Sequence, residues 1–353
     1  MRNISDIGVV ALGPFNRGNG LFDKAVWPLG ENLEYPYVLL REALDKKNIE
    51  MNTLDMRHLD AFDIILCFDV PSPKGLPGNA SLEQLAAMGK GLYLVLSENE
   101  MRLPENWDIS NHRYFNKIFT WNDAMVDGKK YIKYFIPNKI PKDIVMGRRD
   151  ERKLCTLIAS NMYSKHPQEL YSERVRAIRW FENNRPNDFD LYGRGWNSKI
   201  VLAELHSLSK RSRENADSNI YSSYNGQITS KREILSKYKF SICYENARDF
   251  PGYISEKIFD CFFAGTIPVY LGAPNVTDFI PNDTFIDKRK YLTYESLYEY
   301  IFKMPQKEYE GYLHNIKKYV LGKRIRQFSA KYFVDTIIRN IITDGTEGVG
   351  GLR

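Results

Sequence analysis

One segment, Tyr238–Pro274, constrains the fold of this chain more than any other part of its sequence. It begins with an apolar run of strand length, Phe240–Tyr244, which stops at two polar residues before a turn rich in Gly and Pro. The apolar residues then adopt helical spacing, and Gly265 is placed to end that helix. A second apolar strand, Thr266–Leu271, follows. The segment therefore predicts a strand, a turn, a helix and a strand, which is the repeating unit of an α/β domain.

The polar residues of this segment fall where such domains bind ligands. Glu245 and Asn246 stand at the carboxyl end of the first predicted strand, and Glu256 and Lys257 lie in the first turn of the predicted helix. Ligands of α/β domains bind in the crevice outside the carboxyl ends of the strands. A helix N-terminus there offers free N–H groups and a positive dipole end to a phosphate. With a lysine added at that point, the segment predicts a diphosphate site.

Length and composition fit a soluble protein of two domains. The chain has 353 residues, 43% of them hydrophobic and 27% charged, which is ordinary for globular proteins. A net charge of +6 permits anionic partners such as nucleotides but is weak evidence for nucleic acid. The four cysteines form no CxxC pair, so we interpret them as reduced core residues of a cytosolic protein. No apolar run has the length of a signal peptide or membrane span, and we therefore expect a cytoplasmic location.

Alternation of strands and helices predicts a parallel α/β domain in each half of the chain. Asp63–Phe68 and Gly91–Leu96 are the clearest strands of the first half. The boundary falls where two prolines, a glycine and clustered charges occur together. The predicted division is a domain at 1–137, a linker at 138–153, a domain at 154–325, and a terminal helix with a flexible tail at 326–353.

The last helix, Ser329–Thr343, is amphipathic. Its apolar side carries Tyr332, Phe333, Ile337, Ile338 and Ile341. Such a stripe is typical of a helix that packs on the core of its own protein. The basic residues that flank it leave peripheral contact with an anionic membrane as an alternative. The tail from Gly345 to Arg353 is expected to be disordered.

The opening segment resembles the donor motif of the α-1,3-fucosyltransferase family, glycosyltransferase family 10. The resemblance is carried, in order, by Tyr244–Asn246, Tyr253–Lys257 and Gly272–Pro274. It implies the GT-B arrangement, in which two Rossmann-like domains face each other across a cleft. It also implies that GDP-fucose binds in the C-terminal domain and that the sugar carbon is inverted. The donor contacts that it implies come from Asn246, Tyr253, Glu256 and Lys257.

Three shorter elements extend the resemblance. Ser97–Glu100 is similar to the element of the N-terminal domain whose first glutamate is the proposed base, which implies that Glu98 is catalytic. Ser160 and Asn161, followed by Arg174, resemble a Ser-Asn element and a phosphate-binding arginine, although the spacing to the arginine is longer here. Asp190–Arg194 resembles a recurring family turn and adds Arg194 to the donor site.

Each role has an alternative that requires no catalysis. An inverting transfer needs a base for the acceptor hydroxyl and positive charge for the diphosphate leaving group. Glu98 fits the first need, with Glu100 as a rival and a solvated loop acid as the alternative. Lys257 and Arg174 fit the second, while the alternative for Arg174 is a charge on a helix surface. Glu256 would bind the fucose hydroxyls or steady positive charge on the sugar, and helix-dipole complementarity is its alternative.

No metal or cofactor is expected. The sequence has no DxD element of the kind that metal-dependent sugar transferases use, and it has no Walker loop. Its histidines are isolated from one another, which favours structural or solvent-facing roles: His58, His112, His166, His206 and His314. A helix N-terminus with Lys and Arg would replace the cation electrostatically.

The sequence hypothesis is an inverting transferase that moves L-fucose from GDP-fucose to a hydroxyl of a GlcNAc-containing or related glycan, in an α-1,3/1,4-type linkage. The absence of an anchor and of paired cysteines suits a bacterial enzyme that acts on a surface-polysaccharide or lipopolysaccharide precursor. The longer spacer at Asp249–Pro251, and Ser255 where threonine is common, keep another GDP-sugar as an alternative. A non-catalytic protein that binds nucleotides or anionic glycans is a further alternative, and nucleic-acid binding is a distant one.

Overall fold

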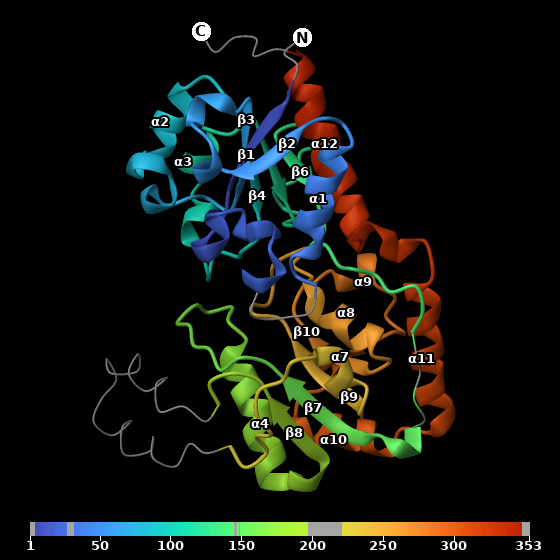
Figure 1. Ribbon diagram of the computed structural model, residues 1–353. Coiled ribbons are helices and arrows are strands. Elements are labelled where there is room, and N and C mark those ends of the chain that lie inside the picture. The colour runs from blue at the N-terminus through green and yellow to red at the C-terminus, as the bar shows by residue number, and fades with distance from the viewer. Residues whose placement is uncertain (1–3, 27–31, 145–146, 148, 197–220, 348–353) are drawn as a thin grey trace, which may run out of the picture. The chain divides into compact units, whose positions relative to one another are not determined.

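A computed structural model describes residues 4–26, 32–144, 147, 149–196 and 221–347 (Figure 1). The chain forms two compact units: unit 1 comprises Met1–Ile140 and Arg326–Arg353, and unit 2 comprises Pro141–Ile325. The C-terminal helix, which the sequence left as a separate segment, thus belongs to unit 1. The polar and basic composition of 207–219 favours a loop, and this stretch lies outside the described residues.

Unit 1 is built on a six-stranded parallel sheet. Its spatial order is β2-β1-β3-β4-β5-β6. The strands are β1 (Asp6–Val10), β2 (Glu50–Thr53), β3 (Ile64–Phe68), β4 (Gly91–Leu96), β5 (Lys117–Thr120) and β6 (Tyr131–Lys133). The helices of this unit are α1 (Tyr35–Asp45), α2 (Leu82–Ala87), α3 (Ile109–His112) and α12 (Ala330–Glu347). The predicted parallel α/β architecture of this half is confirmed.

The core of unit 1 lies along the central strands. Every residue of β3 is buried, as its continuous apolar run predicts for a strand covered on both faces. Helix α12 lies beside α1 (Figure 1) and buries Phe333, Ile337 and Ile341. The amphipathic stripe therefore packs on the core of the protein, as expected. Tyr332 is the exception, because 44% of it is exposed, with its ring centroid 6.2 Å from that of Phe135.

Unit 2 contains a five-stranded parallel sheet in the order β11-β10-β9-β7-β8. The strands are β7 (Lys153–Ile158), β8 (Phe189–Tyr192), β9 (Tyr238–Tyr244), β10 (Ile267–Leu271) and β11 (Ile286–Asp287). The helices are α4 (Tyr171–Asn184), α7 (Lys231–Leu235), α8 (Glu256–Phe263), α9 (Val276–Phe279), α10 (Tyr294–Lys303) and α11 (Gln306–Val320). The predicted strand, turn, helix and strand of the opening segment are all present.

The helix of that segment, α8, starts at Glu256 with Ser255 as its N-cap, so Glu256 and Lys257 lie in its first turn as predicted. An N-cap serine satisfies one of the free N–H groups of the first turn. At the other end, Gly265 has a φ of +65°, a conformation that glycine adopts without strain, and the helix ends there as predicted.

Each sheet has one point where the chain reverses the direction in which strands are added. In unit 1 it lies between β1 and β3, and in unit 2 between β7 and β9. Ligands of open α/β sheets bind outside the carboxyl ends of the strands at such points. The topology alone therefore favours two ligand sites, one at the carboxyl ends of β1 and β3 and one at the carboxyl ends of β7 and β9.

Candidate active site

The carboxyl end of β9 holds a fully buried acid, Glu245. Its carboxylate accepts hydrogen bonds from the backbone N–H of Ser255 at 2.9 Å and from the Ser255 hydroxyl at 2.6 Å. The Nζ atom of Lys257 lies 3.4 Å from the same carboxylate. A buried charge persists only when it is paired and hydrogen-bonded. Glu245 therefore anchors the start of α8 to the end of β9.

Beyond Glu245, charges of alternating sign continue along the first turns of α8. Lys257 Nζ donates to the Ser255 hydroxyl at 3.0 Å and lies 3.7 Å from the Glu256 carboxylate. Lys231, from α7, lies 3.4 Å from Glu256 and 2.8 Å from Asp260. The charged network at the start of α8 therefore consists of three acids and two lysines: Glu245, Glu256, Asp260, Lys231 and Lys257.

This network keeps its key groups ionised. Burial opposes the ionisation of Glu256, but the charges of Lys257 and Lys231 outweigh it and hold the pKa of Glu256 well below its usual range. Burial also disfavours the charged form of Lys257, yet Glu256 and Glu245 raise the pKa of Lys257 above its ordinary value. The start of α8 therefore presents an ammonium group and a carboxylate side by side over the whole neutral range.

Arg174 joins this site from α4. It is buried, and its Nη2 atom donates to the carbonyls of Tyr244 at 2.7 Å and Glu245 at 2.8 Å, and to Asn246 Oδ1 at 3.1 Å. Burial lowers the pKa of Arg174, although a guanidinium stays charged at neutral pH. The alternative of a helix-surface charge is therefore wrong. Arg174 lies at the carboxyl end of β9, next to the switch point of the sheet.

Other predicted donor residues lie on the loops around the same switch point. Asn161 follows β7 and donates from Nδ2 to the carbonyl of Gly195 at 3.1 Å, while its backbone N–H bonds the carbonyl of Arg194 at 2.8 Å. The turn is tight at Gly193, where a Cβ atom would lie 1.9 Å from the carbonyl oxygen of Ala159. Glycine is required there because the loops after β7 and β8 pack backbone to backbone. Ser160 is half-buried beside them.

Asn246 and Tyr253 occupy the turn between β9 and α8. Asn246 is half-buried, and its carbonyl accepts the N–H of Leu170 at 2.9 Å, in addition to its side-chain bond with Arg174. Only 4% of Tyr253 is exposed, so it is part of the wall of the turn. The structure thus brings together in unit 2 the predicted donor residues Arg174, Asn246, Tyr253, Glu256 and Lys257.

The predicted base, Glu98, belongs to unit 1, where it follows β4. Its backbone is held on both sides: the N–H bonds Asp69 Oδ1 at 3.0 Å, and the carbonyl accepts from Asn106 and Trp107, each at 3.2 Å. Its side chain is 36% exposed, with Arg102 Nε 3.7 Å from the carboxylate. The rival Glu100 is exposed. The loop is fixed while the Glu98 carboxylate stays accessible to a reactant.

Asp69, which sequence reasoning missed, organises this loop. It follows β3 and is buried, and its Oδ1 atom accepts from the N–H groups of Ser97 and Glu98 and from Asn106 Nδ2 at 2.6, 3.0 and 2.6 Å. Burial raises the pKa of Asp69 to about 6, against the effect of these hydrogen bonds. The available signal was its place directly after the apolar run of β3, at the same sheet edge as Glu98.

Two further site residues were also missed. Glu245 belonged to the recognised motif but received no role, and Lys231 is remote in sequence from the acids that it contacts. Glu245 could have been found from its place at the end of an apolar strand, whereas no spacing in the sequence points to Lys231.

Within the described ranges, no group of three or more His, Cys, Asp or Glu is placed to hold a metal ion. His112 is buried, bonding the carbonyl of Asn106 at 2.8 Å.

Comparison with solved structures defines the class of fold. A crystal structure of an α1,3-fucosyltransferase with GDP-fucose superposes with a TM-score of 0.55, covering 95% of this chain and 90% of that chain at 15% sequence identity. At this identity the similarity concerns the fold alone. The fold is that of the GT-B glycosyltransferases, with a parallel α/β sheet in each unit.

The sequence comparisons identify the family. The family described as glycosyltransferase family 10 (fucosyltransferase), C-terminal part, matches residues 148–334, which is more than half of the chain. The chain belongs to this family. An α-(1,3)-fucosyltransferase of Helicobacter pylori is 40% identical over 75 residues, 21% of this chain and 15% of that protein. A GDP-fucose protein O-fucosyltransferase 3 of Gallus gallus is 37% identical over 84 residues, 23% and 18% of the two chains. The matched segments thus span less than a fifth of these relatives.

Proposed function

We propose that this protein is an inverting glycosyltransferase that moves L-fucose from GDP-fucose to a hydroxyl group of a GlcNAc-containing or related glycan. Family membership supports the class of reaction, and the relatives named for fucosyl transfer support the donor. The proposed linkage is of the α-1,3/1,4 type.

The observation that carries the proposal is the charge arrangement at the switch point of unit 2. Lys257 lies in the first turn of α8, and Arg174 is buried beside the end of β9. Together with the N–H groups of the helix start they provide positive potential for a diphosphate. As the bond to fucose breaks, negative charge grows on that diphosphate, and preorganised positive groups stabilise it. The Arg174 bonds described above all use Nη2, so Nη1 and Nε are not engaged in them.

In this mechanism the predicted site residues have separate roles. Lys257 and Arg174 bind the diphosphate oxygens, while Asn246, Tyr253, Ser160, Asn161 and Arg194 shape the donor site. The ionised Glu256 binds fucose hydroxyls or steadies the positive charge that develops on the sugar. Glu98 takes the proton of the acceptor hydroxyl as that oxygen attacks the sugar carbon from the face opposite the diphosphate. The proposal requires Glu98 to reach the acceptor while the donor is bound in unit 2.

Donor binding and transfer are tested in two steps. Isothermal titration calorimetry with GDP-fucose, GDP-mannose and GDP measures the donor preference. A preference for GDP-mannose would replace fucose with another sugar in the proposal. The protein is then incubated with GDP-fucose and a panel of neutral glycans, acidic glycans and folded protein domains, and products are identified by mass spectrometry. Protein acceptors belong in the panel because some relatives carry the name of protein O-fucosyltransferases.

Donor binding without transfer to any acceptor would favour a non-catalytic binding protein.

For cellular location, we propose a cytoplasmic enzyme that acts on a surface-glycan precursor such as that of lipopolysaccharide. No described helix is long and apolar enough to cross a membrane. Peripheral membrane contact through α12 is a weaker proposal, because unit 1 covers most of the apolar face of that helix. Flotation with anionic vesicles tests this contact.

A further inference from the structure

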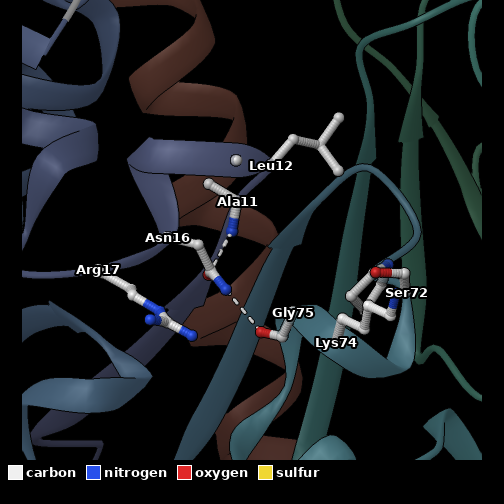
Figure 2. Close-up of a pocket in the computed structure, with 9 residues that line it drawn as sticks. Ala11, Leu12, Asn16, Arg17, Ser72, Lys74 and Gly75 are labelled. Carbon is white, nitrogen blue, oxygen red and sulfur yellow. Dashed lines mark hydrogen bonds between the residues drawn. The ribbon is translucent and has the colours of Figure 1, made fainter.

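Unit 1 has a pocket at its own switch point, where the mechanism above places no residue. The loops that follow β1 and β3 line it with residues 11–17 and 71–75, and its volume is about 390 Å³ (Figure 2). Binding pockets for small molecules begin at about 300 Å³. This pocket therefore has room for a small ligand such as a single sugar residue.

The two walls of the pocket are held together. Asn16 accepts the N–H of Ala11 at 2.9 Å and donates from Nδ2 to the carbonyl of Gly75 at 2.5 Å, which links the loops, as Figure 2 shows. The second wall contains Pro71 and Pro73, whose rings fix the backbone. The pocket is therefore formed before a ligand arrives, and little ordering entropy opposes binding.

The charged side chains that line the pocket are basic. Arg17 stands on one side, and Lys74 and Ser72 stand on the other (Figure 2). Among the residues that the structure describes, the side chains of Arg17 and Lys74 make no hydrogen bond or ion pair, although the Arg17 carbonyl accepts the N–H of Gly20 at 2.9 Å. The acid that interacts with Arg17 is Asp55, whose carboxylate accepts the Thr53 hydroxyl at 2.5 Å and the N–H of Gly18 at 2.8 Å. Partial burial opposes ionisation of Asp55, but these hydrogen bonds and, less strongly, the charge of Arg17 lower its pKa. Asp55 thus offsets part of the Arg17 charge, and Lys74 remains unopposed.

We propose that this pocket binds an anionic group of the acceptor, a carboxylate or phosphate carried by a sugar residue of the glycan. The inference rests on the proposed function, because it assigns the acceptor to unit 1 and an acidic sugar to its switch point. The planar Arg17 guanidinium can donate two parallel hydrogen bonds to two oxygens of either anion, and the Lys74 ammonium adds a second positive charge. The Ser72 hydroxyl is placed to bond a sugar hydroxyl.

The test measures binding without donor, so that it does not depend on transfer. Ligand-observed NMR titrations compare methyl β-glucuronide, glucose 6-phosphate and the neutral methyl β-glucoside. We expect the wild-type protein to bind at least one anionic sugar about tenfold more tightly than the neutral one, since two exposed charge pairs contribute roughly that factor. The glucuronide and phosphate titrations distinguish the two anions. The double variant Arg17→Gln/Lys74→Gln should lose this preference.

A matched control removes the same charge elsewhere in unit 1. Lys47 and Lys129 lie on the loops before β2 and β6, at the amino ends of the strands, whereas the pocket lies at the carboxyl ends. Both lysines are exposed. The Lys47→Gln/Lys129→Gln variant should therefore keep the preference for anionic sugars. Equal binding of charged and neutral sugars by the wild type, or an unchanged preference in the Arg17/Lys74 variant, would overturn the proposal. Absence of transfer to every acceptor, with this preference intact, would instead count against the proposed function alone.

Discussion

The switch points of the two sheets handle charge in opposite ways. In unit 2, Lys257 lies 3.4 Å from the buried Glu245 carboxylate at the start of α8, and Arg174 donates to backbone carbonyls. In unit 1, Arg17 and Lys74 lie exposed on loops that β1 and β3 carry. Paired charges fix a geometry before the ligand binds, whereas the exposed side chains of Arg17 and Lys74 can still move on the fixed loops that carry them. The contrast suits a site for one constant donor in unit 2 and a site for a particular acceptor in unit 1.

The largest test of this contrast concerns Glu98. In the Glu98→Gln variant we expect transfer to fall about 10³-fold, because general-base catalysis contributes roughly that much. GDP binding should be unchanged, since the donor residues lie in unit 2. Initial rates measure the loss of transfer, and calorimetry measures GDP binding. Glu100→Gln is the matched control, and a comparable loss of rate in that variant would transfer the role of base to Glu100.

The second test removes a paired charge from unit 2. Lys257→Ala should lower the transfer rate about 10²-fold, in line with the loss of one preorganised group that stabilises developing negative charge. It should also reduce the free energy of unfolding by about 3 kcal/mol, because Glu245 is left buried without its cation. Chemical denaturation accompanies the rate measurement. Lys237→Ala, which breaks an exposed pair with Glu233, should change neither quantity noticeably.

The third test uses the raised pKa of Asp69. Burial moves this pKa from its ordinary 3.8 to about 6, so the folded protein binds the proton more tightly than the unfolded chain. The stability from Asp69 is therefore full below about pH 4 and is lost as the pH rises through about 6, a change of about 3 kcal/mol. The difference in unfolding free energy between wild type and Asp69→Asn should follow that curve.

Activity separates a positioning role of Asp69 from a purely structural one. Asparagine keeps an oxygen acceptor for the N–H groups of Ser97 and Glu98, so Asp69→Asn should retain most transfer activity. Asp69→Ala removes the acceptor and should lower kcat about tenfold, with KM for GDP-fucose unchanged. Equal kcat values for the two variants at matched folded fraction would show that the loop does not depend on Asp69.

The smallest expected effect comes from Lys231, at the far end of the charged network. Lys231→Met leaves Glu256 and Asp260 with less positive charge nearby, so the pKa of Glu256 should rise. Because Lys231 is 30% exposed, the loss in unfolding free energy should be only about 1 kcal/mol. Transfer should weaken at acidic pH, where Glu256 would become protonated, and recover toward neutral pH. A pH profile identical to that of wild type would remove Lys231 from the site.

The sequence predicts the elements of this fold well because their signals are local. The buried run Asp63–Phe68 and the change from strand to helical spacing around Ser255 depend only on neighbouring residues. The recognised motif likewise placed Glu256 and Lys257 at the start of a helix. The contact of Lys231 with Glu256 depends on how α7 packs on α8, and the bonds of Asp69 to the Glu98 loop depend on the register of β3 with β4. No local pattern encodes such distant pairings.

The position of α12 has a consequence for the order in which the chain acquires structure. Unit 2 is one continuous stretch, Pro141–Ile325, whereas unit 1 needs residues on both sides of it. During synthesis, unit 2 is complete on leaving the ribosome while the apolar surface that Ile337 and Ile341 will cover is still open. Domains fold as units when their sequence is complete. Unit 1, although most of it is synthesised first, is therefore expected to complete its folding after unit 2. Until α12 is synthesised, the exposed apolar surface of unit 1 would be a binding site for chaperones.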